Sequence, residues 1–250
     1  MKKRSITNLS KLAIIFLLFA GLIYKLSCSG ARLKPSPAQT SNPIATKETA
    51  ATDSMIPDNN QKSDINFPKA AKEIKDFVVA PYQISMETYG LLNDDNLEDA
   101  VLVLQNSTDS TQARPTLVLL QQPDGSYTLN TKSFKAIGAA YINGDYKQYD
   151  TEDIKIDSAK LIISTYSMGA VGNRTTQYRF VDNQLVLTYM ETYNMGAGGQ
   201  TGAVYDMLNQ KVTITDVNTT KEDMPATISS SKMQKHKSYL FNDIDPTEIF

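Results

Sequence analysis

The residue types that most often carry catalysis are scarce in this chain, which has one cysteine, Cys28, and one histidine, His236. A Cys–His nucleophilic pair or a Ser–His–acid triad needs an imidazole beside the nucleophile. His236 lies in the polar, lysine-rich run Lys232–Lys237, where neighbouring positive charge opposes its protonation, so we interpret it as an exposed residue of that run. A single Cys and a single His also provide neither an intramolecular disulfide nor the ligands of a structural zinc site.

Carboxylates are the remaining groups that could do chemistry. A pair of them can cleave a glycosidic bond without Cys or His. The chain has 27 Asp and Glu, so neighbouring acids occur by chance. Those that come close in the sequence or end a strand are Asp94, Asp95, Glu98, Asp99, Glu152, Asp153 and Glu191. We expect no enzymatic activity and keep a carboxylate-based envelope hydrolase as an alternative.

The most acidic segment, Gly90–Leu104, resembles the strand–loop–strand signature Gly-Asp-Leu-Asn-x-Asp-Gly-x-x-Asp of FG-GAP and VCBS-type (integrin-α-like) repeats. It is closer still to uncharacterised bacterial exported proteins, lipoproteins among them, that carry this signature once. Similarity to that group extends to Asp76–Tyr82, Arg114–Tyr127 and the hairpin Tyr178–Leu187, and covers roughly residues 68–217. The resemblance implies a β-rich exported domain with no assigned catalysis.

In those families the acidic loop binds Ca²⁺ through oxygens at alternate positions. The resemblance places these ligand positions at Leu91, Asn93, Asp95, the Leu97 carbonyl and Asp99. Leu91 stands in place of the first Asp and offers no oxygen, while Asn96 stands in place of the turn Gly. Calcium affinity follows the number of charged ligands, so we expect a degenerate, structural loop and no bound cofactor. The weak metal candidates that remain are Asn93, Asp95 and Asp99.

Two segments of similar sequence, Thr165–Gly172 and Thr192–Gly199, share Thr-Tyr, Met-Gly-Ala and a final Gly, and each begins where a strand is expected to end. We predict two glycine-rich loops at one end of a sheet. The residues that would contact a ligand there are Tyr166, Met168, Tyr193 and Met195. The alternative is that the glycines only permit positive φ angles and the loops bind nothing.

Residues 1–27 are typical of an export signal. The basic start Lys2–Arg4 precedes the uncharged stretch Leu12–Tyr24. Thirteen helical residues span about 20 Å, short of the roughly 30 Å hydrocarbon core of a bilayer, so a signal peptide fits better than a spanning helix. Leu26–Gly30 resembles the lipobox of bacterial lipoproteins, with Cys28 as the lipidated residue and Lys25 where the motif has an aliphatic residue. An uncleaved signal anchor is the alternative, and both predict a membrane partner.

Residues 28–66 are rich in Ser, Thr, Ala, Asn and Pro, which predicts a disordered linker. Without the first 27 residues the chain keeps 20 basic and 27 acidic residues, a net charge of −7. Phosphate backbones would repel such a domain, so we expect no nucleic-acid partner.

The folded domain is expected over residues 67–220, with residues 221–250 as an extension packed on it or trailing from it. Pro68–Val78 has the pattern of a short amphipathic helix. After it come short runs rich in Val, Ile, Thr and Tyr, which predict an antiparallel, mainly β (α+β) sheet or sandwich. Val101–Leu104 and Leu117–Leu120 are apolar on both faces, so these strands should be central.

Two hairpins are predicted by their turn residues. The first joins Leu117–Gln121 to Tyr127–Leu129 across a segment that contains Pro and Gly. The second joins Thr175–Val181 to Leu185–Met190 across Asp182-Asn183.

Together these features predict an exported, membrane-anchored lipoprotein of the periplasm or cell surface. Its domain would be non-catalytic and would bind an envelope protein or glycan, or serve a structural role. A single-pass, signal-anchored structural protein is the third possibility.

Overall fold

The structure is a computed structural model that describes residues 65–144, 146–168, 172–234, 236 and 238–249. The leader 1–27, Cys28 and most of the linker 28–66 therefore lie outside the described residues. In the part that is described, no helix has the length and hydropathy needed to cross a membrane.

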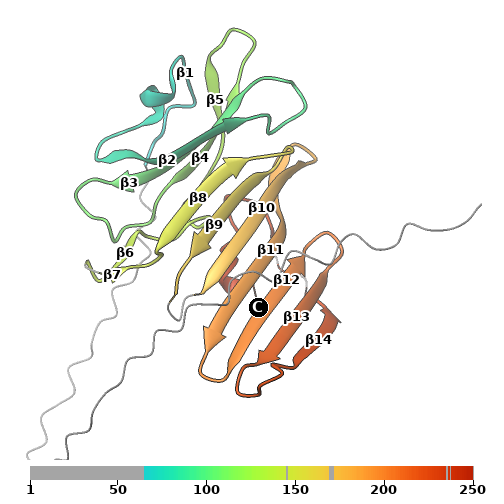
Figure 1. Cartoon of the computed structure of the whole chain (residues 1–250). Helices are drawn as coiled ribbons and strands as arrows, with labels where there is room; N and C mark the ends of the chain where they lie inside the picture. Colours follow the sequence, from blue (N-terminus) through green and yellow to red (C-terminus); the bar gives the residue numbers. More distant parts are fainter. Residues whose placement is uncertain (1–64, 145, 169–171, 235, 237, 250) are drawn as a thin grey trace, which may run out of the picture. The chain divides into compact units, whose positions relative to one another are not determined.

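The described chain is mainly β, with antiparallel sheets, as predicted. Its elements are β1 (Ala70–Ala71), η1 (Ile74–Phe77), β2 (Tyr82–Gly90), β3 (Asp99–Asn106), β4 (Thr116–Gln121), β5 (Tyr127–Ser133), β6 (Tyr141–Ile142), β7 (Tyr146–Lys147), β8 (Thr151–Ile156), β9 (Leu161–Tyr166), β10 (Asn173–Val181), β11 (Gln184–Gly196), β12 (Gly199–Asp206), β13 (Lys211–Asn218), β14 (Ala226–Lys232) and η2 (Pro246–Glu248). They form a five-stranded sheet in the order β1-β5-β4-β3-β2, a seven-stranded sheet that runs in order from β14 to β8, and the small pair β6-β7 (Figure 1).

Strands β3 and β4 lie at the centre of the five-stranded sheet and are buried on both faces, as their sequences predict. Side chains such as Leu102 and Leu117 pack against Phe67 and Phe77 on one face. Side chains such as Val101 face the core shared with the seven-stranded sheet. Continuous apolar runs are what a strand covered on both sides requires.

The predicted helix over Pro68–Val78 is not present. That segment forms β1, which pairs with β5, and the single 3-10 turn η1. Isolated helices of this length are marginal, and here the start of the segment pairs with β5 while Phe77 is buried against the sheet. The spacing of the apolar residues therefore identified residues that pack on the sheet, but the secondary structure predicted from it was wrong.

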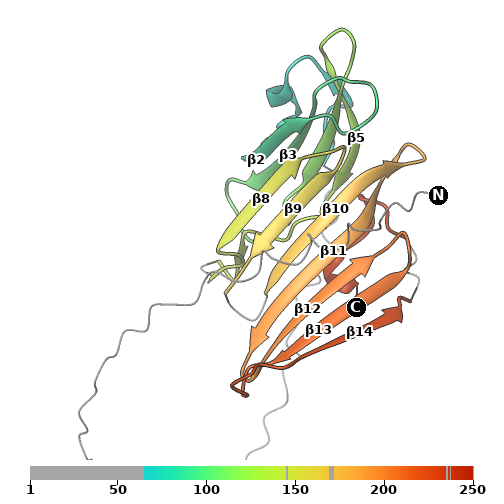
Figure 2. The ribbon, with the colours of Figure 1, turned by 45° about the vertical axis from the view of Figure 1, so that its right-hand side comes forward.

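Both predicted hairpins are confirmed, as β4-β5 and β10-β11. Asp182 and Asn183 connect the second hairpin with φ angles of 49° and 61°, the positive pair that a type I′ turn requires. Strands β8 and β14 were not predicted. Strand β8 lies beside β2, so the two sheets meet along these strands (Figures 1 and 2).

One hydrophobic core joins the two sheets and the end of the chain. Phe241, Ile244 and Ile249 are buried in it. Phe241 stands edge-on to the buried Tyr178 of β10, with ring centroids 5.0 Å apart. Such edge-to-face pairs add to the stabilisation that comes from burial. The C-terminal segment therefore forms part of the core.

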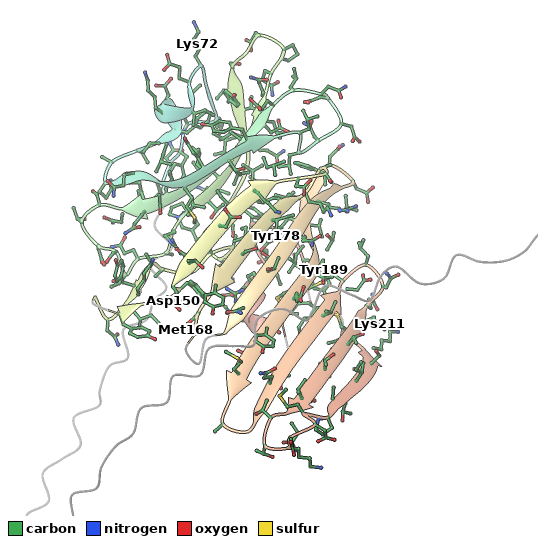
Figure 3. The ribbon with its side chains drawn as sticks, viewed as in Figure 1. Lys72, Asp150, Met168, Tyr178, Tyr189 and Lys211 are labelled. Carbon is green, nitrogen blue, oxygen red and sulfur yellow. The ribbon has the colours of Figure 1, made fainter. Side chains whose placement is uncertain are left out.

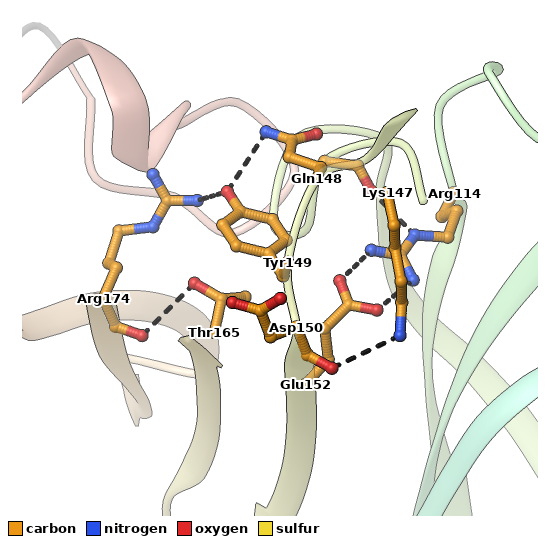
Figure 4. A network of polar contacts seen from close by, with 9 residues as sticks. Arg114, Lys147, Gln148, Tyr149, Asp150, Glu152, Thr165 and Arg174 are labelled. Atoms are coloured by element: carbon orange, nitrogen blue, oxygen red, sulfur yellow. Dashed lines mark hydrogen bonds and ion pairs between the residues drawn. The ribbon is translucent and has the colours of Figure 1, made fainter. Parts of the chain in front are cut away.

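A buried ion pair also connects the sheets (Figure 4). Arg114 precedes β4 and has only 1% of its side chain exposed. Its guanidinium donates to both carboxylate oxygens of Glu152 on β8, and its Nε donates to the Gly138 carbonyl at 2.7 Å. The bidentate geometry and the third acceptor satisfy a charge that would be costly to bury alone.

We predict that Glu152→Ala lowers the free energy of unfolding by about 3–5 kcal/mol, because it leaves the Arg114 guanidinium buried without its partner. Urea unfolding measures this change. The control is Lys75→Ala, which removes the exposed pair Lys75–Glu73 and should leave stability nearly unchanged. Equal effects of the two substitutions would contradict the role given to Arg114.

Candidate functional site

The four residues predicted to form a binding mouth lie around one hollow. Tyr166, Met168, Tyr193 and Met195 line it, together with Ser167, Gly172 and Asn173, and its volume is about 60 Å³. We call Tyr166, Met168, Tyr193 and Met195 the rim. The structure thus brings together two chain segments whose similarity was visible in the sequence. The second segment is not the predicted loop, because β11 continues through Tyr193 and Met195 to Gly196.

Strand pairing brings the two halves of the rim together. Tyr166 is the last residue of β9, and Tyr193 of β11 lies opposite Asn173 of β10. The Asn173 side-chain oxygen accepts from the Ser167 N–H at 3.1 Å. Asp150 accepts from the Met168 N–H at 2.8 Å, which fixes the backbone at that methionine. Both residues are labelled in Figure 3.

Gly172 is needed where β10 begins beside β11. Its φ is +71°, and an added Cβ would lie 1.9 Å from the Asn194 side-chain oxygen and 2.7 Å from the Tyr193 carbonyl oxygen. No other residue fits there without displacing the backbone of β11. The glycine therefore permits the close approach of the strands that carry the rim.

The rim is apolar and accessible. Met168 is 74% exposed and Met195 55% exposed, and Tyr166 is also exposed. Thioether side chains adapt to differently shaped apolar surfaces, and tyrosine adds a rigid ring with one polar group. The rim therefore presents apolar side chains of two kinds, flexible and rigid, at the surface.

The acidic loop between β2 and β3 is closed by its own hydrogen bonds. The buried carboxylate of Asp99 accepts from the N–H groups of Leu92, Asn93 and Gln121 at 3.1, 3.3 and 3.1 Å. Asp95 accepts from the Leu97 N–H at 2.8 Å and from the Asn93 side chain at 2.9 Å. These carboxylate oxygens therefore already have backbone or amide donors.

Leu91 supplies no oxygen to this loop, and Asp95 and Asp99 both accept hydrogen bonds from backbone N–H groups. Asn96 has a φ of +62°, so it adopts the left-handed conformation expected of the residue that replaces the turn Gly. Within the described ranges, no group of three or more His, Cys, Asp or Glu could hold a metal ion.

Burial raises the pKa of Asp99 above its ordinary value of 3.8, and the three backbone N–H donors oppose this effect in part. The carboxylate thus loses solvation while it holds the start of β3 to the loop and to the end of β4.

A larger groove of about 630 Å³ lies beside the acidic loop, and sequence analysis missed it. Asn93 and Asp95 line one side, while Arg179 and Phe180 come from the β10-β11 hairpin on the other. Its volume falls in the range of small-molecule sites. The two sides are more than 80 residues apart in the chain, so no local pattern could indicate the groove.

The other candidate residues have structural contacts. Glu152 is bound by Arg114, and Glu191 accepts from the Tyr189 hydroxyl at 3.2 Å. His236 is half-buried, whereas the sequence predicted it to be exposed, because its ring packs on Tyr239 and its Nδ1 lies 2.9 Å from the Ser238 carbonyl oxygen.

Comparison with known proteins adds no identification: no family model, no curated protein and no solved structure matches the chain. The resemblance to FG-GAP and VCBS-type loops therefore stays a prediction.

We predict that Asp99→Asn lowers the free energy of unfolding by about 1–3 kcal/mol, since the amide replaces one acceptor oxygen with a donor that faces N–H groups. The pKa of Asp99 is higher in the folded than in the unfolded chain, so folding favours the protonated carboxyl group. The stability that this preference contributes is fully present below the unfolded-state pKa and is lost as pH rises through the folded-state pKa. The deficit in unfolding free energy of the variant should therefore narrow as pH rises from below the ordinary Asp pKa of 3.8 through the raised folded-state pKa.

Chemical denaturation over that pH range tests this, with Asp95→Asn at the exposed end of the loop as the control. A deficit that widens with rising pH would be inconsistent with the raised pKa.

Proposed function

We propose that the protein is a non-catalytic binding module of the cell envelope that is tethered to a membrane and binds a partner protein at the rim. The observation that carries this proposal is the gathering of Tyr166, Met168, Tyr193 and Met195 around one hollow. Exposed large apolar residues that cluster are typical of interaction sites, whereas single ones are common on any surface.

A protein partner is favoured over a glycan by the side-chain types. Two of the four rim residues are methionines, which suit apolar side chains of variable shape. The hollow, about 60 Å³, lies among these aromatic and thioether side chains. A binding segment would insert one apolar side chain between the tyrosines, with the methionines adapting around it.

The tether is supported by sequence alone. Leu12–Tyr24 has the length of a signal-peptide core, and Cys28 follows it after the short segment Lys25–Ser27. A lipid-modified Cys28 would anchor the chain at a membrane surface by more than one acyl chain. The linker of about 38 residues would then let the domain reach on the order of 30–35 Å from its anchor.

Site-specific photo-crosslinking in cells tests the binding site. A photo-reactive residue at Met195 should give a discrete crosslinked protein, whereas one at Leu91 should not. Leu91 is the matched control because it is 48% exposed, close to the 55% of Met195, and lies in the acidic loop outside the rim. Identical products at both positions would refute the rim as the binding site, and products that contain only cell-wall glycan would refute a protein partner.

Mass spectrometry of the mature N-terminus tests the tether. We expect a diacylglyceryl-modified Cys28 at the N-terminus of the natural protein, and a Cys28→Ala protein that carries no acyl chain and keeps its leader. An unmodified chain that begins at Met1 would instead indicate a signal anchor.

A further inference from the structure

The edge strand β14 is exposed along its whole length. All seven of its residues, Ala226–Lys232, are exposed, and it pairs on one side only, with β13. At the other end of the same sheet, β8 lies against β2. Open edges normally carry a bulge, a proline or a central charge that prevents further pairing. The register between β13 and β14 is regular, and within β14 the one charge is the terminal Lys232.

The hydrogen bonds at both ends of this ladder show which backbone groups point outward. Asn218 N–H donates to the Pro225 carbonyl at 3.0 Å, and Met233 N–H donates to the Gln210 carbonyl at 2.8 Å. In an antiparallel ladder, hydrogen-bonded and non-hydrogen-bonded residue pairs alternate. Every second residue from Pro225 onward therefore directs its backbone hydrogen-bonding groups to β13. The residues between them direct their N–H and C=O groups to the open edge, and these are Ala226, Ile228, Ser230 and Lys232.

We infer that this edge pairs with the β14 strand of a second copy of the chain, in antiparallel orientation, to give a two-fold dimer with one continuous sheet. Antiparallel self-pairing places Ala226 opposite Lys232 and Ile228 opposite Ser230, with Ser229 on the two-fold axis. Each outward N–H and C=O then has a partner. Ile228, which is 70% exposed in the single chain, packs beside the new strand.

The charges at the two ends of β14 favour a second copy in this orientation. Lys211 lies beside Lys232 at one end. Glu222 and Asp223 lie in the turn at the other end. Antiparallel pairing brings the basic end of each copy near the acidic end of the other. Parallel pairing would place the two Lys232 side chains next to each other.

The axis is perpendicular to the sheet, so both copies present the same face. If the rim binds a protein as proposed, the dimer carries two such sites on one face and can bind bivalently. Dimerisation itself does not depend on that proposal.

Engineered disulfides in the full chain, purified in detergent in a Cys28→Ala background, test the register. Ser229→Cys should form an intermolecular disulfide on mild oxidation, because directly opposed residues that are not hydrogen-bonded lie close together in an antiparallel pair. Ser230→Cys is the matched control and should not, since Ile228 lies opposite it. Equal crosslinking of the two variants, or none in either, would overturn the inferred pairing.

Sedimentation velocity of the same full chain in detergent gives an independent test. Ser230→Pro removes an outward N–H that β13 does not use and should raise the dimer dissociation constant by about tenfold or more, while Ser230→Ala should not. Lys232→Glu should weaken the dimer, and adding Glu222→Lys and Asp223→Lys to that variant should restore it. This charge reversal tests the same pairing even if the proline variant does not fold. A chain with the natural β14 sequence that stays monomeric up to about 100 µM would overturn the proposal.

Discussion

The relative placement of the two sheets depends on the buried guanidinium of Arg114. A charge with 1% exposure must be fully paired, and its partners, Glu152 and the Gly138 carbonyl, lie on segments that follow the five-stranded sheet in the chain. Because both carboxylate oxygens are used, the pair fixes direction as well as distance. The apolar side chains of both sheets then pack in the space between them.

This arrangement explains why the exposed features lie where they do. Strands β9, β10 and β11 pack their inner faces on the core, so Tyr178 and Leu187 are buried while the rim at the strand ends stays outside. The sheet extends beyond the core at β14, where side chains on both faces are exposed. The buried central strands therefore support two accessible surfaces, the rim and the β14 edge, whose side chains are not part of the core.

Much of the fold follows from local sequence. Runs that are apolar on both faces identified β3 and β4 as central, and turn residues such as Asp182-Asn183 identified hairpins. Strand β8 was missed because Glu152 occupies an inward position where the alternation requires an apolar residue; its carboxylate is bound by Arg114 instead. Strand β14 was missed because seven exposed residues carry no burial pattern.

The candidate site was predictable only where the sequence repeats itself. The two copies of Thr-Tyr and Met-Gly-Ala indicated the rim, and the strand register brought them together. The groove beside the acidic loop and the ion pair of Arg114 depend on contacts between residues far apart in the chain. Such contacts are set by how sheets pack, which no single segment encodes.

The central claim is that both sheets and the C-terminal segment form one cooperative unit, and native-state hydrogen exchange measures this most directly. We predict that the slowest amides of β3 and β4 and those of β10 and β11 exchange with the same free energy and the same denaturant dependence. Two distinct levels of protection, one for each sheet, would contradict a shared core.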